Sequence, residues 1–459
     1  MLRASMQTQP IMGPKLPKKK KLVLVSDLDW TMVNHKDANH RDLLRFNKVW
    51  TKHFAEESVL IYSSGRSPTL YKELALEVPL LAPDILVCSV GTEILVHGVA
   101  DAEWERYLDE GWDREQVVTI VNRFPELVMQ QASEQRPHKV SYKLYAADAN
   151  QAQGVVSNLR AHLTGAGIQA NVIFSGGQDL DVLPSRASKG KALSFLLQQL
   201  EEANGCAPEH GVIVCGDSGN DIELFQVPGV HGCVVANAHD ELREWYEENK
   251  DNEKIFLASL DGPAGIRESL THFGFVDVCT PHDKMVRRSC VVDLHSWFER
   301  YFADAHGDEE YDDIANDDVD GIGYVARQMD GSFELVAPSG SISSKTSLLG
   351  WLQSCGRGSQ AHSVAQSEGS PPAVFRIWID QYSERELVAG SDVWLVQYYE
   401  CQQKFPCNST EQRRGRTVRV ASAILKKEQQ GGTLPYSWHH VHETWVEQFP
   451  SIEGVAGHQ

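Results

Sequence analysis

Four short apolar runs, none interrupted by a polar residue, constrain the fold more than any other feature of the sequence. They occupy residues 22–25, 59–62, 85–88 and 212–215. Such runs are typical of strands buried on both faces of a parallel sheet. Helical stretches at 67–77 and 190–202 lie between them. Strands that alternate with helices predict a doubly wound α/β domain, in which ligands bind beyond the carboxyl ends of the strands.

The pattern changes between residues 101 and 175. Two amphipathic stretches that favour helices accompany two segments of alternating polarity, at 115–122, 149–164, 139–145 and 169–174. We interpret this part as a small α+β cap inserted into the α/β domain. The predicted first domain is 22–275, with its core at 22–100 and 176–275 and its cap at 101–175. A cap in this position can cover the strand ends and exclude water.

The remainder of the chain predicts a second domain over 276–459. One amphipathic helical stretch is followed by long apolar and aromatic segments, at 286–302, 374–379, 393–399, 417–425 and 438–446. This order favours an α+β domain with a curved sheet. Residues 304–320 hold nine acidic side chains without Lys or Arg and are interpreted as a solvated loop. The Pro- and Lys-rich start, 1–21, is expected to be a disordered tail.

Composition excludes several classes of protein. The 459 residues carry 43 Lys and Arg against 63 Asp and Glu, a net charge of −20, which argues against a general nucleic-acid binder. No apolar run approaches the roughly 18 residues of a membrane helix. The nine cysteines are scattered without a CxxC pair, so neither a disulfide framework nor a zinc site is predicted. We expect a cytoplasmic protein.

The strongest chemical signal is Asp27-Leu28-Asp29-Trp30-Thr31, directly after the first apolar run. Carboxylates two positions apart point to the same side of an extended chain. One of them can act as a nucleophile and the other as an acid and base. Alone, the pair could equally be a helix cap or a solvated loop.

Three further motifs follow in order. Ser64-Gly65-Arg66, after the second run, offers a hydroxyl and backbone amides to phosphate oxygens. Lys189 stands at the start of a helix, where its ammonium would offset phosphoryl charge. After the last run, Asp217 and Asp221 supply carboxylates for a hard cation, with Asn220 between them. Each motif alone has an ordinary structural explanation, but the four in this order favour phosphoryl chemistry.

This set resembles the four ordered motifs of the haloacid dehalogenase-like phosphatases. The resemblance implies that Asp27 attacks phosphorus to form an aspartyl-phosphate, and that Asp29 protonates the leaving oxygen and then activates water. It implies that Ser64 and Lys189 hold the transferring phosphoryl group. It also implies Mg²⁺ as cofactor, bound by Asp27, the Asp29 carbonyl, Asp217 and Asp221, because metal and Lys must neutralise the phosphate before a carboxylate can approach it.

A narrower resemblance is to the sucrose-phosphate phosphatase family. It is carried by residues 91–94, 134–141, 175–184, 215–225 and 230–232. Residues 375–380 and 438–445 resemble the extra domain of the plant-type members, which implies a C-terminal cone of the nuclear-transport-factor-2-like type. The substrate-binding candidates are Gly65, Arg66, Glu93, Lys139, Ser141, Gln178 and Asn220.

One position departs from that family. Val128 stands where the family commonly has a Lys that is thought to face the sugar. The departure puts the sugar contacts in doubt, but not the phosphoryl chemistry. For each sugar-contact candidate, ordinary cap or sheet packing is an equal alternative.

The predicted function is Mg²⁺-dependent hydrolysis of sucrose 6-phosphate to sucrose and phosphate, the last step of sucrose synthesis. The alternatives are a phosphatase of another sugar phosphate and a non-catalytic partner of sucrose-phosphate synthase. The second alternative is disfavoured because Asp27, Asp29, Lys189 and Asp217 are all present. The synthase as a partner and a homodimer formed through the C-terminal domain are further expectations.

Overall fold

The computed structural model describes residues 15–175, 178–278, 282–303, 321–356, 358–359, 374–405, 416–428 and 435–446. The first 14 residues and the acidic stretch 304–320 lie outside the described residues, so the tail and loop interpretations there stay predictions. In the part of the chain described, no helix is long and apolar enough to cross a membrane.

The core of the first domain is built on an eight-stranded sheet in the order β12-β11-β10-β1-β2-β3-β4-β5. The first six strands in this order pair in parallel, whereas β4 and β5 are antiparallel. The strands are β1 (Val23–Ser26), β2 (Val59–Ser63), β3 (Ile85–Cys88), β4 (Glu93–Val96), β5 (Val99–Ala100), β10 (Val212–Gly216), β11 (His231–Val234) and β12 (Ile255–Leu257). The doubly wound α/β prediction is confirmed.

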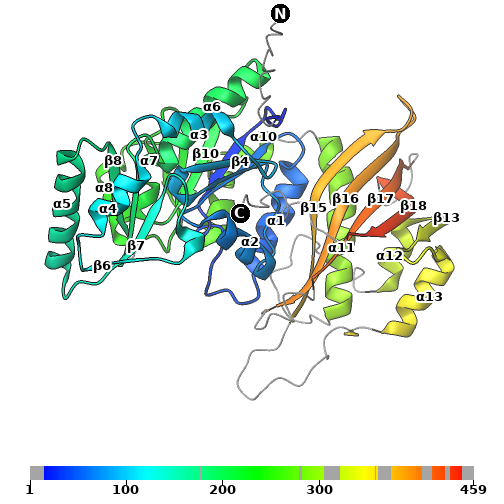
Figure 1. Ribbon diagram of the computed structural model, residues 1–459. Coiled ribbons are helices and arrows are strands. Elements are labelled where there is room, and N and C mark those ends of the chain that lie inside the picture. The colour runs from blue at the N-terminus through cyan, green and yellow to red at the C-terminus, as the bar shows by residue number, and fades with distance from the viewer. Residues whose placement is uncertain are drawn as a thin grey trace, which may run out of the picture.

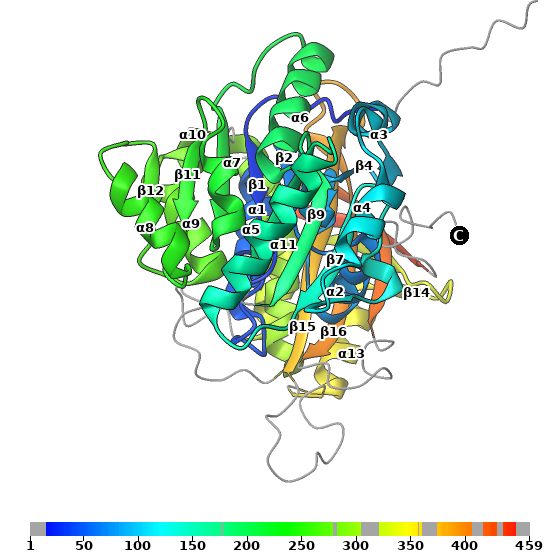
Figure 2. The same cartoon turned by 60° about the vertical axis from the view of Figure 1, so that its left-hand side comes forward.

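Helices cover both faces of this sheet, as Figures 1 and 2 show. One face packs on α1 (Arg41–His53), α2 (Pro68–Glu77), α9 (Gly262–His272) and α10 (Phe275–Val278). The other packs on α3 (Ala102–Asp109), α6 (Lys189–Asn204), α7 (Ile222–Phe225) and α8 (Asp240–Asn249). Leu24 belongs to the first hydrophobic cluster, while Val23 and Val25 belong to the second. The uninterrupted apolar pattern of β1 therefore reflects burial on both faces.

The cap is a four-stranded antiparallel sheet in the order β6-β7-β9-β8. Its elements are β6 (Leu127–Met129), β7 (Val140–Leu144), β8 (Ala170–Ser175), β9 (Asp179–Pro184), α4 (Arg114–Val121) and α5 (Ala149–Gly165). The sequence places the return to the core at residue 176, but β9 pairs with β7 and β8, so the core resumes only after Pro184. β9 was mistaken for a core strand because its apolar residues are buried, Leu180 and Val182 in the cap cluster and Leu183 in a core cluster.

The C-terminal domain is α+β, as expected. Its six-stranded sheet has the order β14-β13-β18-β17-β16-β15 and lies beside the helices at the far end of the molecule from the cap (Figure 1). The elements are α11 (His282–Ala303), α12 (Ile322–Gln328), α13 (Lys345–Cys355), β13 (Met329–Val336), β14 (Ile342–Ser344), β15 (Val374–Glu386), β16 (Val393–Phe405), β17 (Thr417–Lys427) and β18 (Tyr436–Trp445). Trp297, Trp438 and Tyr398 are among the aromatic side chains that fill its own core.

The described end of the N-terminal segment differs from the disordered tail expected over 1–21. Lys19 Nζ lies 2.7 Å from Asp84 Oδ1 and 2.8 Å from the carbonyl oxygen of Ala55. Lys21 Nζ lies 2.7 Å from Glu209 Oε2. The lysines that made this segment look like a solvated tail therefore pair with core residues far along the chain, which a local pattern does not reveal.

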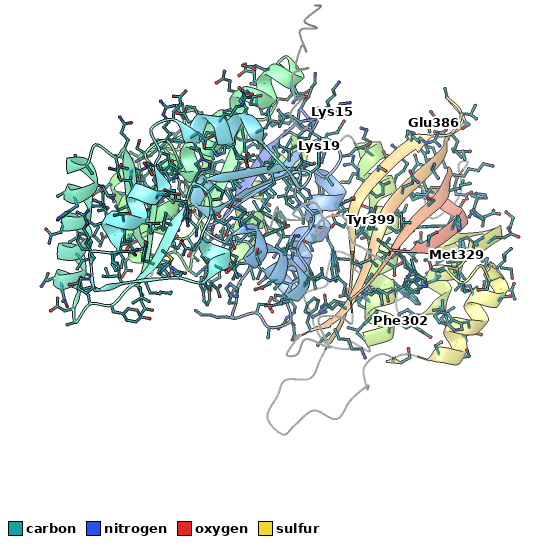
Figure 3. All side chains as sticks on the ribbon, in the orientation of Figure 1. Lys15, Lys19, Phe302, Met329, Glu386 and Tyr399 are labelled. Atoms are coloured by element: carbon teal, nitrogen blue, oxygen red, sulfur yellow. The ribbon has the colours of Figure 1, made fainter. Side chains whose placement is uncertain are left out.

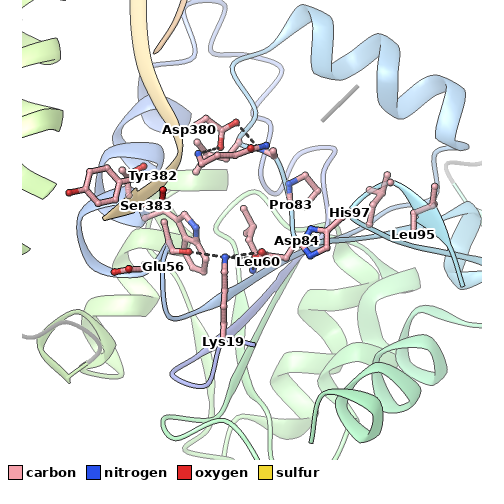
Figure 4. Close-up of a pocket in the computed structure, with 18 of the residues that line it drawn as sticks. Lys19, Glu56, Leu60, Pro83, Asp84, Leu95, His97, Asp380, Tyr382 and Ser383 are labelled. Atoms are coloured by element: carbon pink, nitrogen blue, oxygen red, sulfur yellow. Dashed lines mark hydrogen bonds and ion pairs between the residues drawn. The ribbon is translucent and has the colours of Figure 1, made fainter. Parts of the chain in front are cut away.

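A polar cavity of about 470 Å³ lies between the two domains, as Figure 4 shows. Asp380 reaches across from β15, and its carboxylate accepts hydrogen bonds from the backbone N–H groups of Ala82 and Gln381 at 2.9 and 2.8 Å. Burial raises the pKa of Asp380 to about 7, although these two donors act against the rise. The hydrogen bonds of Asp380 therefore lie at the edge of the cavity between the two domains.

Arg416 links the two domains at the end of α2. Its Nη1 donates to the Ala75 carbonyl at 2.6 Å and its Nη2 to the Val78 carbonyl at 2.9 Å. The guanidinium supplies a donor to the Ala75 carbonyl, whose helix partner would be the N–H that Pro79 lacks, and a second donor to the Val78 carbonyl, which also accepts from Leu80 N–H at 2.8 Å.

We expect Arg416→Ala to destabilise the protein by about 1–3 kcal/mol, because the Ala75 carbonyl then loses this donor at the domain interface. Thermal unfolding followed by circular dichroism measures the effect. Lys426→Ala, which removes an exposed cation of strand β17, is the matched control. Equal melting temperatures for both variants would contradict this role of Arg416.

Candidate active site

Three neighbouring strands, β10, β1 and β2, bring the motifs together at one edge of the core sheet. Asp27 follows β1, Ser64 follows β2 and Asp217 follows β10. Carboxylate oxygens of Asp27, Asp217 and Asp221 all lie within 4.8 Å of one another, and all three side chains are buried. Residues more than 180 positions apart in the chain therefore form one acidic cluster, as the motif order predicts.

Lys189, the first residue of α6, lies within this cluster. Its Nζ lies 2.6 Å from Asp27 Oδ1 and 2.7 Å from Asp221 Oδ1, and the side chain is 1% exposed. Burial would lower the pKa of Lys189, but the charges of Asp221 and Asp27 outweigh it and hold the pKa above its ordinary value. Lys189 is therefore a fixed cation.

The same burial acts in the opposite direction on the carboxylates. Burial raises the pKa of Asp27 well above its ordinary value, and the charge of Lys189 counteracts this rise only in part. Burial and the neighbouring Asp221 raise the pKa of Asp217 to about 6. Three carboxylates against one ammonium leave two negative charges unbalanced in a buried site. An oxygen-ligated divalent cation would balance them, so the donor set fits Mg²⁺.

The loop after β10 positions Asp221 through main-chain contacts. The backbone N–H groups of Asp217 and Ser218 both donate to Asp221 Oδ2 at 3.2 Å. A Cβ at Gly216 would lie 2.6 Å from the Cβ of Asp221, so only glycine allows the side chain to fold back over the strand end. This close approach explains why the first residue of the Gly-Asp-Ser-Gly motif is glycine.

Asp29 lies apart from the three clustered carboxylates. Arg66 donates from Nε to its Oδ2 and from Nη2 to its Oδ1, both at 2.7 Å, and His35 Nε2 lies 2.7 Å from Oδ1. Burial would raise the pKa of Asp29, but these hydrogen bonds outweigh it and hold the pKa well below the usual range. In this state Asp29 is an ionised acceptor beside the cluster.

The Ser64 motif forms a tight turn at the end of β2. The Ser64 backbone N–H donates to the Val87 carbonyl at 2.9 Å, and its hydroxyl oxygen accepts from the Arg66 N–H at 3.1 Å. The hydroxyl hydrogen thus remains for an incoming oxygen. A Cβ at Gly65 would lie 3.9 Å from Val90 Cγ2, an ordinary van der Waals contact, so the turn has room for a side chain there. Asn220 is half-buried, with a buried amide oxygen that has no hydrogen-bond partner among the described residues.

The cap contributes a second polar cluster. Lys139 Nζ lies 3.1 Å from Glu134 Oε2 and 3.6 Å from Asp181 Oδ1, while the Ser141 hydroxyl donates to Asp181 Oδ1 at 2.5 Å. Lys139 and Ser141, two of the sugar-contact candidates, are therefore neighbours. The Gln178 side chain is exposed, although its carbonyl accepts from Leu144 N.

Glu93 joins the core to the cap. Its carboxylate accepts from Arg136 Nε at 2.8 Å and Nη2 at 2.7 Å, and from the Ser89 hydroxyl at 2.8 Å. Val128, the departure from the family pattern, is exposed on β6. Glu93 thus has a positioning contact to the cap in addition to its predicted place in the sugar site.

Sequence reasoning missed several side chains that order the site. Thr31 Oγ1 donates to Asp217 Oδ1 at 3.1 Å, and His239 Nε2 lies 3.6 Å from Asp217 Oδ2. Thr31 was visible as the last residue of the first motif. His35 and His239 carried no signal, because their contacts depend on loop conformation and on strand adjacency.

Known proteins are similar to this chain in sequence. A sequence profile of the sucrose-6F-phosphate phosphohydrolase family matches residues 20–274. Sucrose-phosphatase 2 of Nicotiana tabacum is 37% identical over 442 residues, which cover 93% of this chain and 95% of that relative. The chain belongs to the sucrose-6F-phosphate phosphohydrolase family. The match to the tobacco protein extends over both domains, so membership of the family is not confined to the phosphatase domain.

Two further known proteins match about half of this chain. The mannosylfructose-phosphate phosphatase of Agrobacterium fabrum is 32% identical over 259 residues, which are 55% of this chain and 96% of that protein. The crystal structure of a Synechocystis sucrose-phosphatase in complex with sucrose and phosphate is 34% identical and covers 55% of this chain and 98% of that one, with a TM-score of 0.49.

Proposed function

We propose that this protein hydrolyses sucrose 6-phosphate to sucrose and inorganic phosphate, the final step of sucrose synthesis. The observation that carries the proposal is the buried group of Asp27, Lys189, Asp217 and Asp221 in a chain of the sucrose-6F-phosphate phosphohydrolase family. A buried carboxylate beside a fixed ammonium is the arrangement needed for nucleophilic attack on a phosphate ester.

In the first step, an oxygen of Asp27 bonds to phosphorus while the bond from phosphorus to the sugar oxygen breaks, and Asp29 supplies the proton that the sugar oxygen takes up. In the second step, water attacks the aspartyl-phosphate, gives its proton to Asp29 and releases phosphate. Without substrate, Arg66 pairs with ionised Asp29. A phosphate that approaches the Ser64 turn competes for that guanidinium, and Asp29 must then take up a proton from solvent before it acts as the acid of the first step.

Mg²⁺ is the proposed cofactor, held by the carboxylates of Asp27, Asp217 and Asp221 and by the main-chain carbonyl of Asp29. When bound, the cation supplies positive charge that lowers the repulsion between a carboxylate and a phosphate. Lys189 and the Ser64 hydroxyl orient the phosphoryl oxygens, with the Gly65 and Asn220 groups beside them. The sugar is expected to contact the cap through Lys139, Ser141 and Gln178, with Glu93 at the hinge between cap and core.

We expect kcat/KM for sucrose 6-phosphate to exceed that for mannosylfructose phosphate and trehalose 6-phosphate by about tenfold or more, since contacts with the correct sugar hydroxyls are worth a few kcal/mol. Phosphate release across this panel, with Mg²⁺ and with excess chelator, measures it. If activity on another ester equalled or exceeded that on sucrose 6-phosphate, the assignment of sucrose 6-phosphate as the substrate would be wrong. Undiminished activity in chelator would remove the cation from the proposal.

The synthase association, homodimer and cytoplasmic location remain predictions. The C-terminal residues Trp378, Cys401 and Phe405 pack in the same hydrophobic cluster as the phosphatase core. Truncation after Phe275 would therefore expose apolar surface of the core, which could bind other proteins non-specifically. Co-purification with the synthase and sedimentation of the full chain are the appropriate measurements.

A further inference from the structure

The C-terminal domain contains a second cavity that takes no part in the phosphatase site. It measures about 130 Å³ and lies between α11, α13 and the six-stranded sheet. Its walls include Leu294, Phe333, Leu348, Ile377 and Val441. Phe302 and Met329, labelled in Figure 3, also line it. An engineered cavity of about 150 Å³ with similar apolar walls holds one benzene molecule, so this space suits a single ring.

One end of this cavity is polar, and its charged groups are paired. Arg419 lies 3.3 Å from Glu400 and 2.9 Å from Glu443, and His295 Nε2 lies 3.3 Å from Glu400. His295 Nδ1 is also 2.7 Å from the Val291 carbonyl, so both ring nitrogens face oxygen atoms. Arg419, the guanidinium that lines this end, is already paired with two carboxylates, so it offers no free charge to attract an ionic ligand.

Trp438 provides an unused hydrogen-bond donor at the cavity wall. Its side chain is 1% exposed, and its indole N–H finds no acceptor among the residues that the structure describes. A buried N–H without an acceptor is costly and is rarely retained without a partner. An oxygen atom of a molecule in the cavity would satisfy it.

The rim of the cavity carries an exposed aromatic side chain. Trp351 of α13 is 51% exposed and packs edge-on against Phe302, with ring centroids 6.0 Å apart. Both residues line the cavity. Trp351 therefore places an aromatic ring at the opening of the cavity.

We propose that this cavity binds a neutral single-ring molecule that bears one hydroxyl or carbonyl oxygen. The ring lies among the apolar walls, and the oxygen accepts the Trp438 N–H beside the Arg419 and Glu443 pair. The cavity volume suits a ligand with one ring, and the paired charges of the lining favour a neutral ligand. The Trp438 N–H, which has no acceptor among the described residues, favours a ligand with an oxygen atom. The proposal is independent of the phosphatase reaction.

Isothermal titration of the full-length protein with phenol and toluene tests the proposal, because the two rings have nearly the same volume and only phenol carries an oxygen. We expect saturable binding of both, with phenol tighter. Trp438→Phe keeps a ring but removes the donor, and it should weaken phenol about 2- to 10-fold while leaving toluene unchanged. Unchanged toluene binding also shows that the variant has kept its cavity.

Three results would overturn the proposal. They are no saturable binding of phenol, an equal loss of phenol and toluene in Trp438→Phe, and tighter binding of benzoate than of phenol. Leu335→Phe, which fills the cavity from β13, should abolish the binding of both rings while phosphatase activity is retained. Binding that survives in Leu335→Phe would place the ligand elsewhere.

Discussion

Asp27→Asn is expected to lower phosphate release from sucrose 6-phosphate by about 10⁴-fold or more, the scale seen when a nucleophile is removed from an enzyme. The amide has nearly the same shape as the carboxylate but does not form an acyl phosphate. Quenched reactions of the native protein should yield a phosphorylated Asp27 by mass spectrometry, and those of the variant should not.

The same substitution should leave the fold intact. Lys189 keeps its contact with Asp221, at 2.7 Å, when the Asp27 charge is removed. One buried negative charge fewer also reduces repulsion within the metal-free cluster. We therefore expect a melting temperature no lower than that of the native chain. Asp251→Asn, an exposed carboxylate in a loop, is the control and should keep full activity. Activity of Asp27→Asn within about tenfold of native would refute the nucleophile assignment.

The sequence predicts the acidic cluster well because its chemistry is tied to strand ends. Asp27, Ser64 and Asp217 each follow a run of apolar residues, and such runs are reliable signs of buried parallel strands. Local sequence does not show that β10 lies next to β1. The carboxylates, the hydroxyl and the ammonium of the motifs nevertheless suit one phosphoryl-transfer site, so their chemistry predicts that they come together. Local pattern and chemistry therefore agree at this end of the sheet.

Contacts between distant segments were not predictable in the same way. The Asp29 pair with Arg66 and His35 depends on loop conformation, and the Glu93 pair with Arg136 depends on how the cap meets the core. The end of the cap was misplaced for a related reason. β9 has the apolar character of a core strand, and only its pairing shows to which sheet it belongs.

The domain interface also escaped sequence reasoning. Arg416 reaches the carbonyls at the end of α2, more than 300 residues earlier in the chain. Asp380 reaches Ala82 in a similar way. Charged residues usually indicate a solvent-exposed surface, so sequence alone gave these two no special status. Their contacts between the domains help to explain why the C-terminal domain is packed against the phosphatase and not merely tethered to it.

The largest expected effect on stability comes from Lys189→Met. Lys189 is 1% exposed and contacts both Asp27 and Asp221, so its removal leaves three buried carboxylates with no cation. Removing one partner of a buried ion pair costs about 3–5 kcal/mol. For a domain of this size that corresponds to a fall in melting temperature of roughly 6–20 °C. Lys191→Met is the control, because Lys191 is exposed on the same helix and its Nζ donates to the Ser185 carbonyl at 2.6 Å.

Magnesium should separate the two roles of Lys189. The variant cluster carries one more unbalanced negative charge than the native cluster, so added Mg²⁺ should raise its melting temperature by more than it raises that of the native protein. Activity should stay near background at every Mg²⁺ concentration, because the ammonium that holds the phosphoryl oxygens is missing. Recovery of stability without recovery of activity would identify Lys189 as both a structural counter-ion and a catalytic group. If Mg²⁺ restored both stability and activity, the role of Lys189 would be charge balance alone. If the metal-free variant had the same melting temperature as the native protein, the buried cluster would not be coupled to folding.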